Sequence, residues 1–188
     1  YKPNAANEKP EIGIVRGLAW TSVGGETLEI EVMSLKGSGK LALTGKLGDV
    51  MQESAKIALT YVRYLVQDQV AEDYFEKRDI HLHIPEGAVP KDGPSAGITM
   101  ATAILSAVTG RKVKASVAMT GEITLRGRVL PIGGLKEKLL AANMAGIKTV
   151  VVPEKNRKDV EELSEEITNG MKIVYASTMK DVLSTALC

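Results

Sequence analysis

Three short segments in the first part of the chain have the composition of β-strands. Residues 12–20 (IGIVRGLAW) and 27–35 (TLEIEVMSL) flank a turn-forming sequence, Val23-Gly24-Gly25, and residues 40–48 (KLALTGKLG) end in another glycine. Short β-rich runs bounded by glycine are typical of antiparallel strands and their turns. We therefore expect the domain to begin with three strands.

Two stretches have helical patterns instead. From Asp49 onward, apolar and small residues recur at helical spacing, at Val50, Ser54, Ala58, Tyr61, Val62 and Leu65. Residues 96–108 are apolar almost all round, which predicts a buried helix, and Gly110 would end it.

The second half of the chain alternates between the two patterns. Residues 115–134 read as two or three strands with glycine turns, followed by helices at 135–146, 154–167 and 178–187 and strands at 147–153 and 171–177. Two β-rich runs separated by a helix predict a parallel βαβ unit. We predict one compact domain of the α+β class, with mixed sheets and packed helices.

The composition limits the classes of function. Lys and Arg total 24 against 23 for Asp and Glu, so the charge gives no reason to expect a nucleic-acid or membrane partner. No apolar run is long enough for a transmembrane helix, and the first residues lack the pattern of a signal peptide. The single cysteine, Cys188, can form no internal disulfide, which fits a reducing compartment, and we expect a cytoplasmic protein.

The chain has 188 residues, enough for one domain with a sizeable core. Residues 1–10 (YKPNAANEKP) are polar and contain two prolines. We expect this segment to be a linker from a missing upstream region, and residues 11–188 to form the domain.

Two motifs suggest binding sites but fit them poorly. The stretch LKGSGKLAL resembles a phosphate-binding loop, yet Ser34 and Leu41 stand where that motif needs a glycine and a Ser or Thr. A turn between strands is the better interpretation, and we expect no nucleotide or other cofactor in this chain.

The second motif is a histidine pair. Residues 78–85 (RDIHLHIP) alternate as a strand, so His81 and His83 would share the face opposite Ile80, Leu82 and Ile84. Two such rings could bind a metal ion, but no third ligand is nearby in the sequence. A partly exposed strand face is the favoured interpretation, and we expect no metal site.

The most informative motif surrounds a serine. Residues 93–97 (GPSAG) fit the G-x-S-x-G pattern of a hydrolase nucleophile. Pro94 suits the first turn of a helix and Asp92 or Gly93 could cap it, so we expect Ser95 in the first turn of the buried helix. Free backbone N–H groups and the helix dipole at that point could stabilise an oxyanion. An ordinary helix start is the alternative.

A nucleophilic serine needs a base. No histidine follows Ser95, which excludes the α/β-hydrolase order of Ser, acid and His. Lysine can serve if its pKa of about 10.4 falls by about 3 units, which costs about 4 kcal/mol and requires burial or a nearby cation. The helix after Gly133-Gly134 offers Lys136 and Lys138, both on the flanks of its inner stripe. The spacing leaves the choice between them open, and a solvated flank is the alternative for either.

Long strings of this sequence resemble the proteolytic domain of Lon proteases. They are residues 90–100 (PKDGPSAGITM), 119–142 (MTGEITLRGRVLPIGGLKEKLLAA) and 146–156 (GIKTVVVPEKN), with further similarity at residues 17–32 and 45–54. The resemblance covers residues 11–188. It implies the compact α+β fold of that family and a serine endopeptidase activity based on a serine–lysine dyad.

The resemblance also assigns roles to single residues. Ser95 matches the nucleophile of the family and Lys138 its general base, which makes Lys136 a bystander. Thr120 matches a threonine that contacts the dyad lysine and would help to orient the amine. Asp92 matches an acidic residue next to the serine, whose role the resemblance leaves open.

Lon proteins carry an ATPase module before this domain, assemble as hexameric rings and degrade unfolded, damaged or regulatory proteins. The resemblance therefore implies such substrates, a homo-oligomer, and ATP and Mg²⁺ in a module that this chain lacks. An extended substrate would add to an exposed strand edge, with Trp20 or the strand before Pro85 beside it. Two other hypotheses stay open: a Lon-like domain without activity that packs subunits into a ring, and a hydrolase assisted by His81 or His83.

Overall fold

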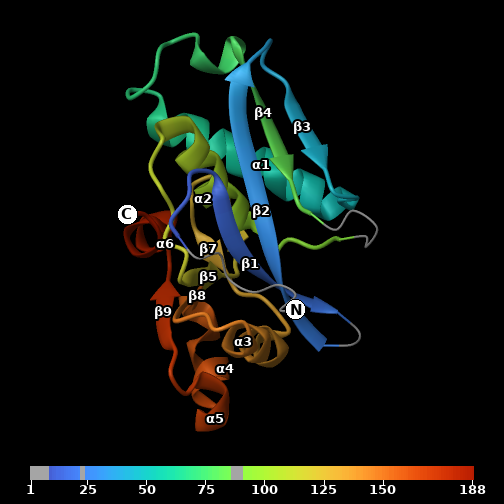
Figure 1. Ribbon diagram of the computed structural model, residues 1–188, viewed down its shortest axis with the longest axis vertical. Coiled ribbons are helices and arrows are strands. Elements are labelled where there is room, and N and C mark those ends of the chain that lie inside the picture. The colour runs from blue at the N-terminus through green and yellow to red at the C-terminus, as the bar shows by residue number, and fades with distance from the viewer. Residues whose placement is uncertain (1–8, 22–23, 86–90) are drawn as a thin grey trace.

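A seven-stranded mixed sheet forms the centre of the molecule in the computed structural model, which describes residues 9–21, 24–85 and 91–188 (Figure 1). The strand order is β3-β4-β2-β1-β5-β8-β9. The strands are β1 (Ile14–Thr21), β2 (Gly24–Lys36), β3 (Leu41–Thr44), β4 (Arg78–His83), β5 (Val117–Met119), β8 (Thr149–Pro153) and β9 (Lys172–Ala176). A separate ladder pairs β6 (Glu122–Ile123) with β7 (Val129–Leu130).

Helices lie on both faces of this sheet. They are α1 (Asp49–Val66), α2 (Gly97–Thr109), α3 (Leu135–Met144), α4 (Arg157–Glu161), α5 (Glu165–Thr168) and α6 (Met179–Ala186), with 3₁₀ turns at Tyr74–Glu76 and Glu154–Asn156. Of the helices in the described part of the chain, none is both long and apolar enough to cross a lipid bilayer.

The two faces bury two separate hydrophobic clusters. Side chains of α1, α2 and α6 pack with β1, β2 and β4 in the larger cluster, and Figure 1 shows α1 and α2 together behind the sheet. Side chains of α3, α4 and α5 pack on the opposite face, over β1, β5 and β8. Because β1 contributes Val15 to one cluster and Leu18 to the other, both helical layers meet around this strand.

The structure confirms the predicted mixture of strands and helices in one α+β domain. Strands β8 and β9 pair in parallel, as predicted, and α1 begins at Asp49. Gly110 ends α2 in a left-handed conformation with φ of 75°. The predicted turn at Val23-Gly24-Gly25 is placed differently, because Gly24 and Gly25 belong to β2 and Val23 lies outside the described residues. Most of the expected linker, residues 1–8, also lies outside them.

One predicted helix is broken into pieces. Residues 154–167 form a 3₁₀ turn followed by the short helices α4 and α5 instead of one helix. The side chain of Asn156 turns inward and exchanges hydrogen bonds with the backbone N–H and C=O of Ile132. Ser164 then caps α5 by accepting a hydrogen bond from the N–H of Glu166. The first pair of bonds joins residues 24 positions apart, and the Ser164 bond is local; both favour the interrupted arrangement over one continuous helix.

Candidate functional site

A cavity of about 500 Å³ lies where β1, the start of α2 and the start of α3 come together. Its lining comprises Leu18, Ala19, Trp20, Leu28, Met51, Asp92, Pro94, Ser95, Ala96, Pro131, Ile132, Gly133 and Lys138. The serine and the lysine that are 43 positions apart in the sequence thus face one hollow. Most of its other side chains are apolar.

Ser95 does not lie in the first turn of α2, contrary to the prediction. The helix begins at Gly97 with Ala96 as its N-cap, and Ser95 precedes it in a turn closed by a hydrogen bond from the N–H of Gly97 to the C=O of Pro94. The predicted caps, Asp92 and Gly93, lie further upstream. The prediction failed because the backbone of Gly121, far away in the sequence, bonds to the backbone at this point.

Gly121 holds the serine turn from the side. Its N–H donates to the C=O of Ser95 at 2.8 Å, and its C=O accepts from the N–H of Ile98 at 3.1 Å. The carbonyl oxygen of Ser95 is therefore occupied as an acceptor by the N–H of Gly121. Among the residues that the structure describes, none accepts a hydrogen bond from the N–H of Ser95 or of Ala96. These two donors stay available beside the serine side chain.

Lys138 reaches the cavity from α3 and is almost fully buried, with 3% of its surface exposed. Burial lowers the pKa of its amine from 10.5 to about 8, because the charged form loses its hydration. Lys136, two residues earlier, is exposed. The structure thus separates two lysines between which the sequence spacing did not decide, and of the two only Lys138 lines the cavity with Ser95.

The start of α3 is held beside the cavity by two close contacts at glycines, one with β1 and one with β2. Gly134 has a φ of 67°, and a Cβ added to it would lie 2.8 Å from the Cβ of Trp20. A Cβ added to Gly25 of β2 would lie 2.0 Å from the C=O of Glu137. Because these positions carry no side chain, the start of α3 can sit directly on the β1–β2 hairpin, and Lys138 then points inward.

Thr120 connects the lysine with the serine segment. It is fully buried, directly after β5. Its hydroxyl accepts a hydrogen bond from Lys138 Nζ at 3.2 Å and donates one to the C=O of Ser95 at 3.5 Å. The residue therefore lies where a group that orients the amine would have to lie.

The serine and lysine side chains share the cavity without a hydrogen bond between them in this conformation. Within the described residues, no hydrogen bond joins Ser95 Oγ to Lys138 Nζ. The lysine amine donates to Thr120 instead. Catalytic hydrogen bonds are often long in a free enzyme and tighten only when substrate binds, so this spacing is compatible with a dyad.

Asp92 holds the segment before the serine against the start of α1. Its Oδ1 accepts hydrogen bonds from the N–H groups of Gly93 at 2.8 Å and Met51 at 3.0 Å. These bonds, that from Gly93 first, hold the pKa of the Asp92 carboxyl below its usual value. The carboxylate thus caps the first turn of α1 and anchors the segment before Ser95 to it.

The other candidate motifs lie away from this cavity. His81 and His83 do not line it, and both rings contact Thr44 of β3. The phosphate-loop-like stretch forms a turn between β2 and β3, as predicted. There the N–H groups of Ser38 and Lys40 donate to Asp79 Oδ1, so a carboxylate already occupies the donors that a phosphate would need. Among the described residues, no three His, Cys, Asp or Glu side chains converge as metal ligands.

Much of the cavity lining was not predicted from the sequence. Leu28, Met51 and residues 131–133 line it, although they lie far from Ser95 in the sequence. Trp20 was expected beside the groove, and it does line the cavity with 57% of its surface exposed. The strand before Pro85, the other segment expected there, does not. The only sequence signal for the missed segment was the glycine turn after Pro131.

The chain is similar to known proteins along its full length. The family described as the Lon protease (S16) C-terminal proteolytic domain matches residues 1–188. The chain is 65% identical over 188 residues to a Lon protease of Lachnoclostridium phytofermentans, and 57% identical over 188 residues to Lon protease 1 of Bacillus subtilis, with all of this chain covered in both. It is 59% identical over 181 residues, 96% of this chain, to a Lon protease of Geobacter metallireducens. The matched regions are 23%, 24% and 22% of those relatives, so the chain spans less than a quarter of their length.

Proposed function

The chain belongs to the family of Lon protease C-terminal proteolytic domains, and on this premise we propose that it hydrolyses peptide bonds with Ser95 as nucleophile and Lys138 as general base. The observation that carries this proposal is the buried Lys138 amine, which shares a cavity with Ser95 and has a lowered pKa. A base must be neutral to accept a proton. With a pKa of about 8, about a quarter of the amine is neutral at pH 7.5, against about 0.1% for an ordinary lysine.

In the proposed reaction, neutral Lys138 takes the proton of the Ser95 hydroxyl while Oγ attacks the carbonyl carbon of the substrate. The N–H groups of Ser95 and Ala96, which no described residue engages, would hold the oxyanion. Protonated Lys138 then passes its proton to the leaving amine, and the bond to nitrogen breaks. Water, deprotonated by the same lysine, attacks the acyl carbon; the bond to Ser95 Oγ breaks, Lys138 returns the proton to Oγ, and the carboxylic acid product leaves.

Thr120 and Asp92 are positioning residues in this proposal. The Thr120 hydroxyl, bonded both to the amine and to the serine segment, would keep the amine directed toward Ser95. Asp92 would keep the serine turn at the start of α1, where it forms one wall of the cavity.

The cavity suggests how a substrate would lie. Strand β1 pairs with β5 only at Arg16 and Gly17, so within the described residues its edge from Leu18 onward has no partner on that side. An extended peptide can add to such an edge through backbone hydrogen bonds, which accept many sequences. The apolar walls formed by Leu18, Leu28 and Met51 would receive an apolar side chain of the substrate.

The broader role follows the family and is also a proposal. Unfolded, damaged or regulatory proteins would be the substrates, and ATP with Mg²⁺ would drive unfolding in a separate module of the whole cytoplasmic protein, assembled as a hexameric ring. Unfolded chains would need no such module, so this domain alone should cleave them without ATP.

Three variants test the dyad. Ser95→Ala and Lys138→Gln should each abolish cleavage of an unfolded protein, whereas Lys136→Gln on the exposed side of α3 should keep it. An active Lys138 variant beside an inactive Lys136 variant would show that the base is assigned wrongly. Covalent labelling of Ser95 by a boronate or another serine-reactive inhibitor separates an enzyme from a domain that only packs subunits.

The pH dependence gives a second test. Peptidase activity should rise with pH and level off above about pH 8, where the Lys138 amine is mostly neutral. A rate that still climbs at pH 10 would contradict a base with this pKa. Loss of activity in a folded His81→Ala, His83→Ala variant would favour the histidine-assisted mechanism instead.

A further inference from the structure

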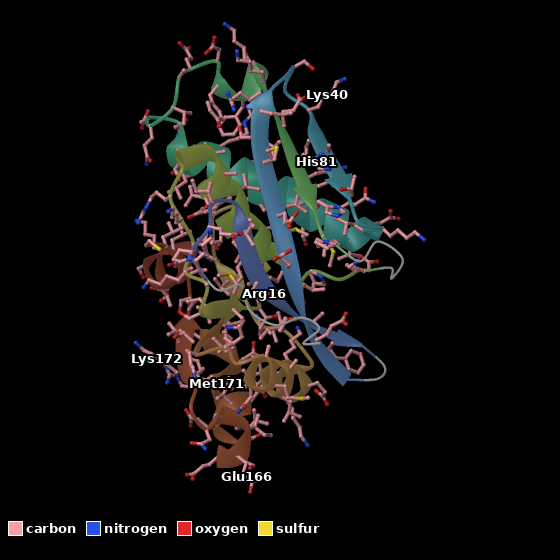
Figure 2. All side chains as sticks on the ribbon, viewed as in Figure 1. Arg16, Lys40, His81, Glu166, Met171 and Lys172 are labelled. Atoms are coloured by element: carbon pink, nitrogen blue, oxygen red, sulfur yellow. The ribbon has the colours of Figure 1, made fainter. Side chains whose placement is uncertain are left out.

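Strands β3 and β4 place a compact group of side chains on the open face of the sheet. On β4, Ile80 and Leu82 point into the core, so His81 and His83 lie on the opposite face and are partly exposed. Figure 2 shows the His81 side chain on β4 in the upper half of the molecule, away from α3. In the parallel pairing of β3 with β4, Thr44 stands beside His83 and shares its face.

One oxygen atom contacts both imidazole rings. Thr44 Oγ1 lies 2.9 Å from His81 Nε2 and 2.6 Å from His83 Nδ1. The two ring nitrogens therefore converge on the Thr44 hydroxyl instead of diverging into solvent. The hydroxyl can donate its proton to only one of them, so the other ring donates to the hydroxyl oxygen; a ring whose proton moves to its other nitrogen presents a lone pair on this side instead.

We propose that this group, His81, His83 and Thr44, is a binding site for one divalent transition-metal ion of the Zn²⁺ type. His81 Nε2 and His83 Nδ1 would bind the ion, and Thr44 Oγ1 and water would complete a tetrahedral shell. In such a shell, with metal–ligand bonds of about 2.0–2.1 Å, neighbouring ligand atoms lie about 3.4 Å apart. The imidazole nitrogens need to move back from Thr44 Oγ1 by less than about 1 Å to reach that spacing.

The sequence pattern alone argued against this site because it offered no third ligand near the histidines. The fold supplies Thr44 from a different strand, 37 and 39 positions away. It also places Glu31 of β2 opposite His83 in the antiparallel register. An acidic residue on the neighbouring strand favours a cation over a neutral ligand.

The chemistry of the ligands selects the ion. Imidazole suits Zn²⁺, Cu²⁺ and Ni²⁺, whereas Mg²⁺ prefers oxygen ligands in an octahedral shell. Two nitrogen ligands with an open outer position make a weaker site than a closed four-ligand one. The site is separate from the cavity that holds Ser95, so metal binding and peptide cleavage can be tested independently.

The test uses Zn²⁺ and the whole chain at neutral pH. His81 and His83 are the only histidines in the sequence, so an NMR spectrum of the imidazole nitrogens has two sets of signals. Zn²⁺ should shift both sets together and saturate at one ion per chain, and Mg²⁺ should shift neither. Shifts confined to one ring, or absent from both, would overturn the proposal.

Variants assign the site. His81→Gln and His83→Asn put an amide near Thr44 in place of each ligating nitrogen, and each should weaken Zn²⁺ binding in calorimetry by at least about tenfold, the smallest loss expected even for an outer-shell change. Cys188→Ser is the control, because it removes the exposed thiol that could bind zinc elsewhere, and its affinity should equal that of the parent. The site would be refuted if Cys188→Ser lost its Zn²⁺ affinity, or if both folded histidine variants kept the Zn²⁺ affinity of the parent.

Discussion

Replacing Lys138 by methionine should stabilise the folded domain at neutral pH, and the gain should shrink as the pH rises. Burial lowers the pKa of this amine to about 8, whereas the unfolded chain has the ordinary value of 10.5. Between pH 8 and 10.5 the unfolded chain therefore binds more protons than the folded one. The free energy of unfolding of the parent rises with pH over this window, and methionine, which does not titrate, removes the effect.

The pKa values set the size of the change. The difference of about 2.5 units is about 3.4 kcal/mol, at about 1.36 kcal/mol per unit. Nearly all of this penalty acts on the parent at pH 7, and about 0.8 kcal/mol of it is left at pH 10. The stability difference between Lys138→Met and the parent should thus fall by about 2.5 kcal/mol from pH 7 to pH 10. The lost hydrogen bond to Thr120 and the packing of methionine change the difference equally at every pH.

Guanidinium unfolding of both proteins at several pH values between 7 and 10 measures this difference. Tyrosines and other groups that titrate in this range are common to both proteins and cancel. Lys136→Met is the matched control, because Lys136 is on the same helix but exposed. Its stability relative to the parent should stay constant with pH.

A constant difference for Lys138→Met would show that the amine titrates normally in the folded state. A stability difference that grows toward pH 10 would also contradict the lowered pKa of this amine. Either result would remove the physical basis for a lysine that is neutral enough to act as a base, independently of any measurement of cleavage.

Three further substitutions test other parts of the structure by thermal unfolding. Thr99→Val should raise the stability by about 1 kcal/mol, because the buried Thr99 hydroxyl has no hydrogen-bond partner among the residues that the structure describes, and a lower melting temperature would contradict this. Asp92→Asn should lower the melting temperature at pH 7, and the gap should close in acid as the parent carboxylate is protonated through its lowered pKa; an equal gap at pH 7 and pH 2 would refute a role for the charge. Gly25→Ala should reduce both stability and peptidase activity, because its Cβ would displace Glu137 and the start of α3; unchanged activity would show that this contact does not position Lys138.

Segments with strong local patterns were predicted well. The alternation in residues 78–85 identified β4 and its buried side, and the helical spacing after Asp49 identified α1. Most residues that face a core are apolar whatever covers them, so periodicity identifies the buried side of an element. The same argument failed for residues 154–167, where the inward hydrogen bonds of Asn156 with Ile132 interrupt a pattern that is helical by itself.

The candidate site depended more on contacts between distant segments. The sequence identified Ser95 by its motif, but the turn that holds it depends on the backbone of Gly121. Spacing did not decide between Lys136 and Lys138, and the resemblance to Lon proteolytic domains predicted Lys138 as the base. The structure buries only Lys138, because α3 rests on the β1–β2 hairpin along that flank.

By itself, then, the sequence determined which segments fold as strands and helices, which sides they bury, and to which family the serine and lysine motifs correspond. Only the tertiary structure decided which lysine loses its hydration, which backbone groups beside Ser95 stay unbonded, and which hydroxyl stands between the two histidines. The physical reason is the distance along the chain over which each interaction acts. Periodicity and turn chemistry act over a few neighbouring residues, whereas desolvation and hydrogen bonding at the site depend on surfaces that chain folding brings together from far apart.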